Sequence, residues 1–503
     1  MFGNFISSAI NLSKNSSKFE RFIMGIEDFF TLIVIALTIT FVFTSVIIKH
    51  DSHWWAGVIL CPIMWLFALY KRKKIKVDKT YESEGDIKII FWCILFAGFT
   101  VRFVVALLLL PEPRNDCAAL SYCVKQWSIG NFIETKSLMQ TSFYAFWQWL
   151  AGPSLRLSQM INAFLGSLQI ALAFDLAKRI FKRGDIAIAA ATITAFHPTF
   201  ISLTLSLYSE LLFGVLMLLS FRAFAIVIKR IEKQIFDKHT AFDSVKLALY
   251  CLGLFYTRGN GFFLIFICSI ILAFLTLFKT KAFFKVFLPY FITIVFVLFI
   301  VGLLNVKIIG TFTISSSEDS YWPLLFGSCI ETKGIFSPSD KNLIMSQYYE
   351  TYPEMNGKKI TMHNLVPFIK KEFYRRWHDE TRQMIDLAFS KYKSMWGTDD
   401  YWVSWFMEKS GEKNFSFKWD LINRPTKSIK HIAAICLVCW LVFLPGLNTT
   451  SRRIVLLVLL FLLLNVINHF FVEWSPRYSY PLTVTLSILS PGIMLFWTGK
   501  RSQ

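Results

Sequence analysis

The feature that most constrains this chain is a series of long apolar runs, each close to the thickness of a bilayer, separated by polar connections. Runs such as 88–110, 202–228 and 284–303 consist mainly of Leu, Ile, Val and Phe. A helix needs roughly 20 such residues to cross the hydrocarbon core. Inside a bilayer only helices and closed barrels satisfy every backbone hydrogen bond. We therefore predict an α-helical polytopic membrane protein.

Composition and charge agree with this fold class. Of 503 residues, 55% are hydrophobic, 52 are Phe and 17% are charged, against roughly 25% charged residues in soluble domains. Lys and Arg outnumber Asp and Glu by 53 to 33. The basic residues lie mainly in short connections between apolar runs, which is typical of cytoplasmic loops. We therefore predict the lipid bilayer, and no nucleic acid, as a partner.

The basic connections also predict an orientation. The cluster Lys71 to Lys76 follows the second apolar run, and such a cluster stays in the cytoplasm. The run 88–110 then leads outward, so that 111–157 and 304–428 are extracytoplasmic and both termini are cytoplasmic. We predict roughly twelve spans, at 29–48, 54–70, 88–110, 158–177, 186–200, 202–228, 244–257, 260–278, 284–303, 429–447, 454–472 and 480–497.

Four regions follow from this arrangement. Residues 1–86 hold an interfacial helix and two extra spans, and 87–303 form a transmembrane core that includes the outer loop 111–157. Residues 304–428 lose the apolar periodicity and are predicted to form an extracytoplasmic α or α+β domain. Residues 429–503 hold the last spans. Two short runs, 186–200 and 244–257, are expected to be tilted, broken or thinned toward the outer face. Leu365 to Tyr392 has the pattern of one amphipathic helix.

Asp116 places a carboxylate where the run 88–110 emerges into water, after the polar connection that begins at Pro111. An ionisable residue at such a place is a functional-site candidate, and Asp116 is the predicted catalytic base. The alternative is that Asn115 or Asp116 caps a helix that begins at Cys117. Arg114 is a candidate substrate-site residue in the same connection.

Other acidic groups and one histidine lie near the same predicted face. Glu210, just inside an apolar run, is either a second catalytic carboxylate or a buried acid paired with a Lys or Arg. His197, before Pro198, is either a substrate-site residue or an ordinary helix-end residue. Glu473 beside Trp474 is either a substrate-site residue or part of an aromatic belt.

Arg258 and Arg477 lie at outer ends of separate runs. Arg is suited to bidentate contacts with phosphate, and Tyr478 is grouped with these two residues. The alternative is that both arginine side chains extend to the lipid headgroups. No metal site is predicted, because Asp399 and Asp400 fit a solvated turn.

Cysteine usage predicts neither a zinc site nor a disulfide framework, because most of the nine Cys fall in apolar runs, including the one CxxC pair, Cys436 and Cys439. Cys117, Cys123 and Cys329 fall on segments predicted to face outward, where a pairing with Cys329 stays open. No cofactor is predicted.

Several short segments follow one another in a distinctive order along residues 85–497. They are Asp116, Thr141–Tyr144, Gly152–Ser154, Asn162–Gly166, Ala177–Phe181, Ala195–Pro198, Leu207–Glu210, Gly253–Gly259 and Pro476–Tyr478. In this order and in topology, the chain resembles the GT-C superfamily of polytopic glycosyltransferases, in particular the bacterial relatives of protein O-mannosyltransferase and of the lipid A aminoarabinose transferase. Unlike many members, which have an acidic pair in the first loop, this chain has Asn115 before Asp116.

This resemblance implies an enzyme that takes a sugar from a polyprenyl-phosphate donor and passes it to an extracytoplasmic acceptor, a glycan, a lipid-linked glycan or a protein. One carboxylate then deprotonates the acceptor hydroxyl, and fixed cations stabilise the departing phosphate. Two alternatives stay open. A lipid-linked sugar flippase or transporter would be expected to show internal repeats, and a surface polysaccharide polymerase or ligase would use the same donors.

Overall fold

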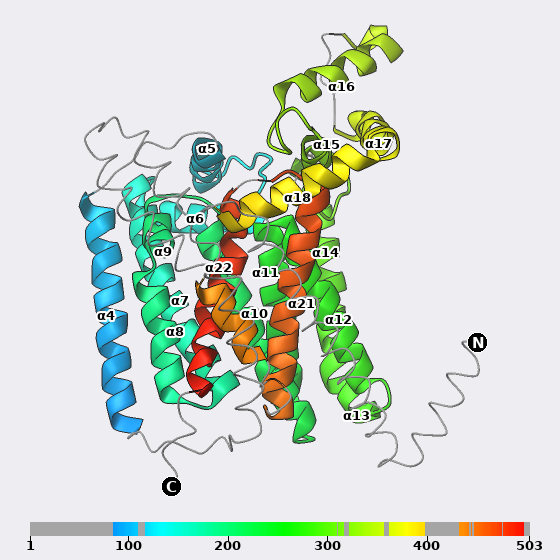
Figure 1. Ribbon diagram of the computed structural model, residues 1–503. Helices are drawn as coiled ribbons and strands as arrows, with labels where there is room; N and C mark the ends of the chain where they lie inside the picture. Colours follow the sequence, from blue (N-terminus) through cyan, green and yellow to red (C-terminus); the bar gives the residue numbers. More distant parts are fainter. Residues whose placement is uncertain are drawn as a thin grey trace.

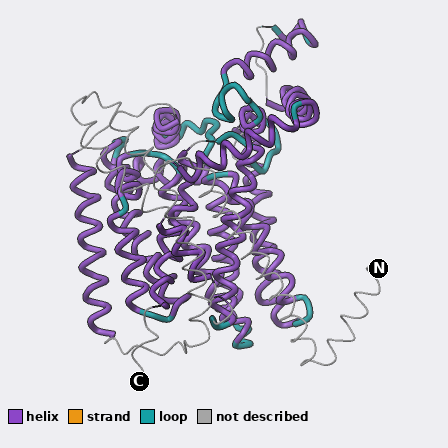
Figure 2. Tube along the Cα trace, viewed as in Figure 1, coloured by secondary structure: helices purple, strands orange, loops and turns teal. Residues whose placement is uncertain are grey.

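The computed structural model describes residues 84–108, 116–308, 310–315, 321–356, 362–397, 432–441, 444, 447–474 and 476–496. These residues form helices, turns and loops, and no strand occurs among them (Figure 2). The predicted spans 29–48 and 54–70 lie outside the described residues, as do Arg114, Asp399 and Asp400. The helical fold class is confirmed, whereas the total of twelve spans stays a prediction.

A bundle of roughly parallel and antiparallel helices forms the body of the molecule (Figure 1). Six described helices, or seven with one bent pair, are long and apolar enough to cross a membrane. The chain is therefore a multi-pass membrane protein. The bundle helices are α4 (Glu84–Leu108), α7 (Leu155–Phe181), α8 (Gly184–Phe196), α10 (Glu210–Glu232), α11 (Lys238–Thr257), α12 (Phe262–Thr276), α14 (Leu288–Ile308), α21 (Thr449–Phe471) and α22 (Tyr480–Leu489).

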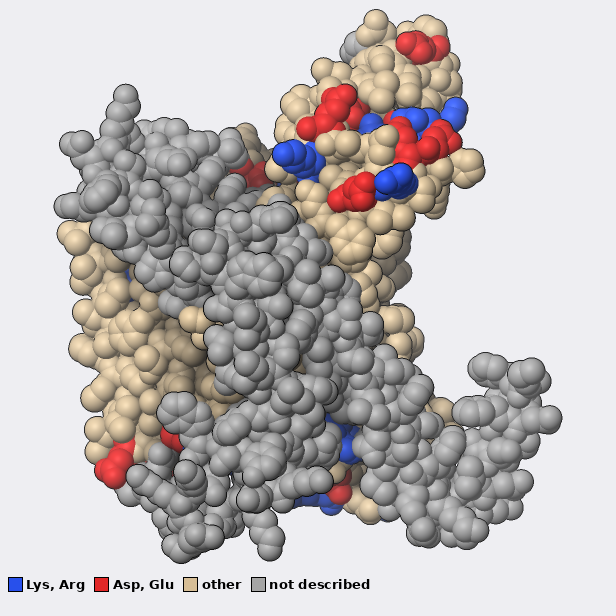
Figure 3. Space-filling view, viewed as in Figure 1, with Lys and Arg blue, Asp and Glu red and all other residues tan. Residues whose placement is uncertain are grey.

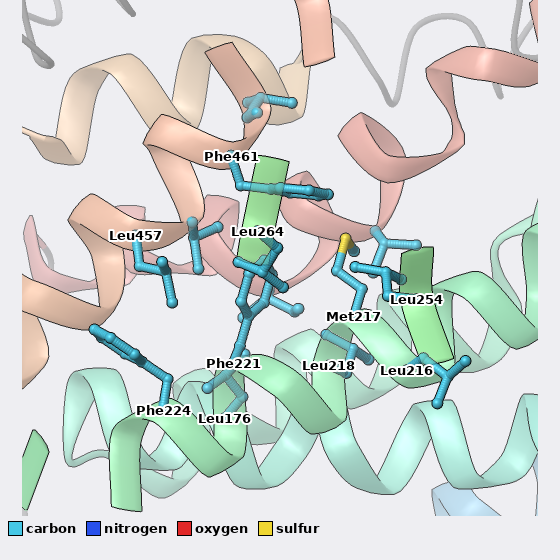
Figure 4. Close-up of a cluster of buried hydrophobic side chains, with 14 of the residues drawn as sticks. Leu176, Leu216, Met217, Leu218, Phe221, Phe224, Leu254, Leu264, Leu457 and Phe461 are labelled. Carbon is cyan, nitrogen blue, oxygen red and sulfur yellow. The ribbon is translucent and has the colours of Figure 1, made fainter. Parts of the chain in front are cut away.

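Apolar side chains fill the centre of the bundle (Figure 4). Phe213 and Phe221 of α10 each lie against Phe461 of α21, with ring centroids 6.5 and 6.0 Å apart. Helix α10 is buried along most of its length and is the central helix. Its position matters for the site because its first residue, Glu210, is carried to one end of the bundle.

That end is the upper end in Figure 1, where α4 and α21 finish and α7 and α10 begin. The opposite, lower end holds Glu84, Phe181 and Glu232. Several ion pairs fasten the helices at the lower end, including Arg453 to Glu232 at 3.0 Å. Such partly exposed pairs contribute little stability individually, but they join segments distant in sequence.

Helix α8 is followed by α9 (Pro198–Ser202) and η1 (Leu203–Leu205). The axis of α8 and the axis of the segment Pro198–Leu205 differ by 52°. The expected break in the run 186–200 is confirmed. Pro198 causes it, because proline cannot donate to the preceding turn. The carbonyls of Thr194 and Ala195 accept hydrogen bonds from Arg102 of α4, at 2.8 and 2.7 Å. Arg102 is fully buried, so it satisfies backbone oxygens that the break leaves free.

Two predicted spans have different limits in the structure. The run 202–228 was predicted as one span, but α10 begins only at Glu210, because η1 and a loop occupy the preceding residues. The run 244–257 belongs to α11, which starts at Lys238 and has 20 residues. Asp237 caps it by accepting a hydrogen bond from the Thr240 backbone N–H, 2.9 Å away. The charged first turns of α11 hid its true start from a hydropathy reading.

Shorter helices cover the upper end. Helices α5 (Asp116–Ser128) and α6 (Leu138–Ala151) follow α4. Helices α15 (Trp322–Gly327), α16 (Pro338–Thr351), α17 (Met362–Asp379) and α18 (Thr381–Gly397) form a projection that we call the cap (Figure 1). In the view of Figure 3, Lys, Arg, Asp and Glu gather on this projection, whereas the described surface of the bundle is mostly of other types.

The prediction of one helix from Leu365 to Tyr392 was wrong, because α17 ends at Asp379 and α18 begins at Thr381. The two helices pack against different partners. Arg376 of α17 pairs with Asp340 of α16 at 2.7 Å, whereas α18 packs along α21. A straight helix could not reach both, and this conflict arises only in the folded molecule.

Candidate functional site

A cavity of about 1050 Å³ lies at the upper end, between the bundle and the cap. Segments far apart in sequence form its walls. Asp116, Leu120 and Cys123 come from α5, and Gln140 from α6; Glu210, Arg258 and Asn260 come from the bundle. Trp322, Phe326 and Lys341 come from the cap. The remaining lining residues include Glu134, Thr135, Lys136, Ser137, Tyr208, Ser209, Thr257, Gly259, Phe262, Phe263, Ser315, Pro323, Phe336, Asn468, His469, Val472, Glu473 and Tyr478.

Asp116 is the first residue of α5, is exposed and lines this cavity. A carboxylate in the first turn interacts favourably with the helix dipole. Glu134 and Lys136, in the connection between α5 and α6, line the same cavity. The connection is anchored by Ser137, whose hydroxyl donates to the Thr257 carbonyl at 2.9 Å. The connection that carries Glu134 and Lys136 is thus tied to the end of α11.

Glu210 and Arg258 form an ion pair in the wall of the cavity. Glu210 is 1% exposed, and its Oε1 accepts a hydrogen bond of 2.6 Å from the Arg258 guanidinium. Arg258 lies at the end of α11, before the turn η2 (Gly259–Gly261). A side chain at Gly261 would come within 2.6 Å of the Leu254 carbonyl carbon. Only glycine therefore lets the chain turn this tightly and bring Arg258 to the cavity.

Arg258 also belongs to a stack of planar groups. Its guanidinium carbon lies 4.6 Å from the centroid of the Tyr478 ring. The other neighbour of Tyr478 is His469, with ring centroids 5.1 Å apart and planes 13° from parallel. Guanidinium groups are attracted to aromatic faces. The stack and the ion pair together limit the rotamers open to Arg258.

The loop after α21 completes one wall, and the cap holds it in place. The Glu473 backbone N–H donates to the Pro323 carbonyl at 2.5 Å, and that of Trp474 donates to Gly334 at 2.8 Å. Lys391 of α18 donates to the carbonyls of Gly327 and Val472, at 2.8 and 3.1 Å. The cap is therefore a structural part of the cavity wall.

Of the residues predicted from the sequence, the cavity brings together Asp116, Glu210, Arg258, Glu473 and Tyr478. His197 is not among its lining residues. It is buried at the break between α8 and α9, with its ring against Phe200. For Arg477 the structure describes only the backbone, in η8 (Pro476–Ser479). Its role and that of Arg114 remain predictions.

Several lining residues were missed by sequence reasoning, notably Gln140, Asn260 and His469. Each lies in or beside an apolar segment and resembles an ordinary polar residue of a helix end. Lys136 and Lys341 were missed because exposed lysines are common in polar loops. A search for polar residues close to the ends of apolar runs would have found the first three.

A second cavity, of about 540 Å³, lies between α5 and α6 and is mainly aromatic. Trp127, Phe132, Phe146 and Trp149 line it. Phe146 and Trp149 are exposed, whereas neighbouring Tyr144 is fully buried and its hydroxyl donates a hydrogen bond to the Asn162 side-chain oxygen. Cys117, Cys123 and Cys329 are free thiols, and burial raises the pKa of Cys117 to about 11.

The described part of the chain shows no cluster of three or more His, Cys, Asp or Glu that could hold a metal ion. What the main cavity offers is an exposed carboxylate, three cationic side chains and an aromatic wall. Such a set can remove a proton from a bound hydroxyl and hold an anionic group beside it.

Comparison with known proteins gives a distant structural likeness. No known protein family and no curated sequence matches the chain. Among solved structures, it is similar to the crystal structure of ArnT from Cupriavidus metallidurans bound to undecaprenyl phosphate. The two are 10% identical, the match covers 82% of this chain and 78% of that chain, and the TM-score is 0.34.

Proposed function

We propose that this chain is a membrane glycosyltransferase that moves a sugar from a polyprenyl-phosphate donor to the hydroxyl of an acceptor. The observation that carries the proposal is the meeting of Asp116 with Arg258, Lys136 and Lys341 on one cavity. The cavity lies at the end of a membrane bundle, where the phosphate of a lipid with a long hydrocarbon tail would lie.

In the proposed reaction, Asp116 takes the proton of the acceptor hydroxyl. The hydroxyl oxygen forms a bond to the anomeric carbon, the bond from that carbon to the phosphate oxygen breaks, and polyprenyl phosphate leaves with the electron pair. General-base work of this kind contributes roughly 10²- to 10⁴-fold. Asp116 suits it because its side chain is exposed on the cavity.

The cations stabilise the charge of the departing phosphate. Glu210 offsets part of the charge of Arg258, since the two are paired at 2.6 Å. Lys136 and Lys341 therefore add charge that a phosphate needs, one from the α5 to α6 connection and one from the cap. Arg477 is a further proposed contributor on the basis of its place beside Tyr478.

The upper end is proposed to face away from the cytoplasm. Lys178 and Arg179 end α7, and Lys229 and Arg230 end α10, all at the lower end. Basic residues that flank spans favour the cytoplasmic side. The acceptor would then be a surface glycan, a lipid-linked glycan or a protein.

The test is transfer from radiolabelled polyprenyl-phosphate sugars into the fractions of membranes that contain this chain. We expect label in an acceptor fraction, release of polyprenyl phosphate, and loss of both in Asp116→Asn. Movement of intact labelled lipid across the bilayer without transfer would instead support a flippase. Absence of transfer with every sugar tried would reject the proposal.

A further inference from the structure

Four residues that line the main cavity each carry a buried acceptor atom without a hydrogen-bond donor. The four atoms are Oε1 of Gln140, Oε2 of Glu210, Oδ1 of Asn260 and Nε2 of His469. All four are shielded from bulk water, and within the described part of the chain none has a partner. They come from α6, α10, the turn η2 and α21. Their shared property is that each has a lone pair to offer.

The orientation of both amides follows from their other contacts. The Gln140 amide nitrogen donates to the Leu207 carbonyl at 2.5 Å. Asn260 donates from its nitrogen to Oδ1 of Asn465 at 2.6 Å. The nitrogen of Asn465 is itself committed to the Phe461 carbonyl at 2.8 Å. Because a carbonyl oxygen only accepts, the unpartnered atom of each amide is its oxygen.

His469 follows the same reasoning. Its Nδ1 lies 3.3 Å from the Glu473 carbonyl oxygen, so Nδ1 carries the proton in this contact. The neutral ring then has a lone pair on Nε2. Glu210 uses Oε1 for Arg258, which leaves Oε2 as the fourth acceptor.

A buried polar atom without a partner destabilises the folded state. Such atoms are few in native proteins, and each calls for a specific cause. An anion such as phosphate would be repelled by these four lone pairs. A divalent cation is disfavoured as well, because Glu210 is the single carboxylate of the set and Arg258 lies beside it. The complementary ligand is one with several hydrogen-bond donors.

We infer that Gln140, Glu210, Asn260 and His469 bind the transferred sugar through its hydroxyl groups, or through an ammonium group if it is an amino sugar. This inference rests on the proposed function. Arg258 then contacts the phosphate, while the four acceptors contact the sugar attached to it. Glu210 serves both parts, because one oxygen holds Arg258 and the other faces the sugar. Its role is binding rather than proton transfer.

His469→Phe tests the inference with little change in shape. Phenylalanine keeps a ring against Tyr478, where the centroids lie 5.1 Å apart, but it lacks both nitrogens. Purified full-length protein would be titrated with undecaprenyl phosphate alone and with undecaprenyl phosphate that carries a hexose or an amino sugar. We expect roughly tenfold weaker binding of the sugar-bearing lipid that the unchanged protein prefers. Binding of undecaprenyl phosphate alone should stay within about twofold.

His378→Phe is the matched control, because the His378 side chain on α17 is 90% exposed and lies outside the cavity. It should change neither affinity. The sugar that the unchanged protein prefers also shows which group of the sugar donates the hydrogen bonds. Tighter binding of the amino sugar indicates an ammonium group, and tighter binding of the hexose indicates hydroxyl groups.

Glu210→Gln is the second variant. It tests the sugar contacts if His469→Phe no longer binds undecaprenyl phosphate and so cannot report on them. Glutamine keeps an oxygen for Arg258 but puts an NH₂ group in place of Oε2. We expect sugar-bearing lipid to bind roughly tenfold more weakly. Undecaprenyl phosphate alone should bind equally well or more tightly, because the charge of Arg258 is no longer offset by Glu210.

Equal effects on lipids with and without the sugar would overturn the inference, as would no effect on either. Loss of sugar-dependent binding on addition of a chelator would point to a metal site and overturn it as well. The proposed function fails separately, if the unchanged protein neither transfers a sugar nor distinguishes sugar-bearing lipid from undecaprenyl phosphate. If the unchanged protein transfers a sugar and the variants bind sugar-bearing lipid as tightly as it does, only the proposed sugar contacts are rejected.

Discussion

At the scale of single residues, an ion pair and a stacking contact together fix the position of the Arg258 side chain. Its partner Glu210 is 1% exposed, and its flat face lies against Tyr478. Removing one member of a buried pair leaves the other charge uncompensated, which costs roughly 3–5 kcal/mol. Loss of either residue therefore has a structural effect that must be separated from an effect on substrate.

Asp116→Asn separates catalysis from helix capping. Asn keeps the shape and caps a helix about as well as Asp, so folding should survive. Turnover should fall by roughly 10²-fold or more, because the amide cannot accept the proton of the acceptor hydroxyl. Steady-state transfer at equal protein content measures this, with donor binding expected to change little. An Asp116→Asn protein of full activity would remove Asp116 as the base.

Arg258→Gln should weaken binding of undecaprenyl phosphate and also lower the melting temperature, since Glu210 loses its partner. The double variant Arg258→Gln with Glu210→Gln removes the uncompensated charge. It should therefore recover most of the stability but not the affinity for lipid phosphate. Thermal unfolding in detergent and lipid binding, measured on both variants, provide the comparison. Recovery of both properties would mean that Arg258 acts only through its ion pair.

At the scale of elements, the cap and the last part of the bundle meet at Lys391. This lysine is 1% exposed, and its amine donates to backbone carbonyls of α15 and of the loop after α21. The same loop carries Val472 and Glu473 to the cavity. Lys391 is thus positioned to fix the cavity wall where α15, α18 and α21 come together.

Lys391 should make stability depend on pH, because burial lowers its pKa to about 7, below the roughly 10.4 of an exposed lysine. Between these values the unfolded chain binds one more proton, so the free energy of unfolding should rise with pH. The slope is about 1.4 kcal/mol per pH unit, and the contribution is smallest and constant below pH 7.

Comparison with Lys391→Met isolates this contribution. Melting temperatures in detergent between about pH 7 and pH 10 should rise more steeply for the unchanged protein than for Lys391→Met. Lys371→Met, at an exposed position of α17, serves as the control and should follow the unchanged protein. Parallel curves for all three proteins would contradict a neutral buried amine.

At the scale of the whole molecule, function depends on which end faces outward. The cavity, α5, α6 and the cap share the upper end, whereas the basic ends of α7 and α10 share the lower one (Figure 1). The distribution of Lys and Arg beside spans favours a cytoplasmic lower end. The cavity would then open on the extracytoplasmic side, where its proposed acceptors lie.

Cysteine labelling in intact cells tests this orientation. Glu350→Cys, exposed on α16, should react with a membrane-impermeant maleimide added outside. Lys281→Cys, exposed at the lower end, should react only after the membrane is opened. The unchanged protein measures the background from native cysteines. Reaction of position 350 from the cytoplasmic side alone would reverse the assignment.

The class of the protein and most of its helix limits follow from the sequence, because transfer of an apolar side chain into a bilayer is a local and roughly additive property. The runs 88–110, 284–303 and 454–472 correspond within a few residues to helical spans. The length of an apolar run is local as well, and the break in 186–200 was expected because that run is shorter than a straight span needs. The five predicted residues that line the main cavity were chosen from the sequence by two criteria, the predicted topology and the residue type.

The site contacts were decided by tertiary structure alone. Glu210 meets Arg258 only because α10 packs beside α11, and His469 meets Tyr478 only where η8 turns back on α21. The division of residues 365–392 into two helices likewise reflects competing partners, α16 and α21. Local propensity cannot reveal such contacts, because their free energy depends on packing between segments that are distant in sequence and close only in the folded chain.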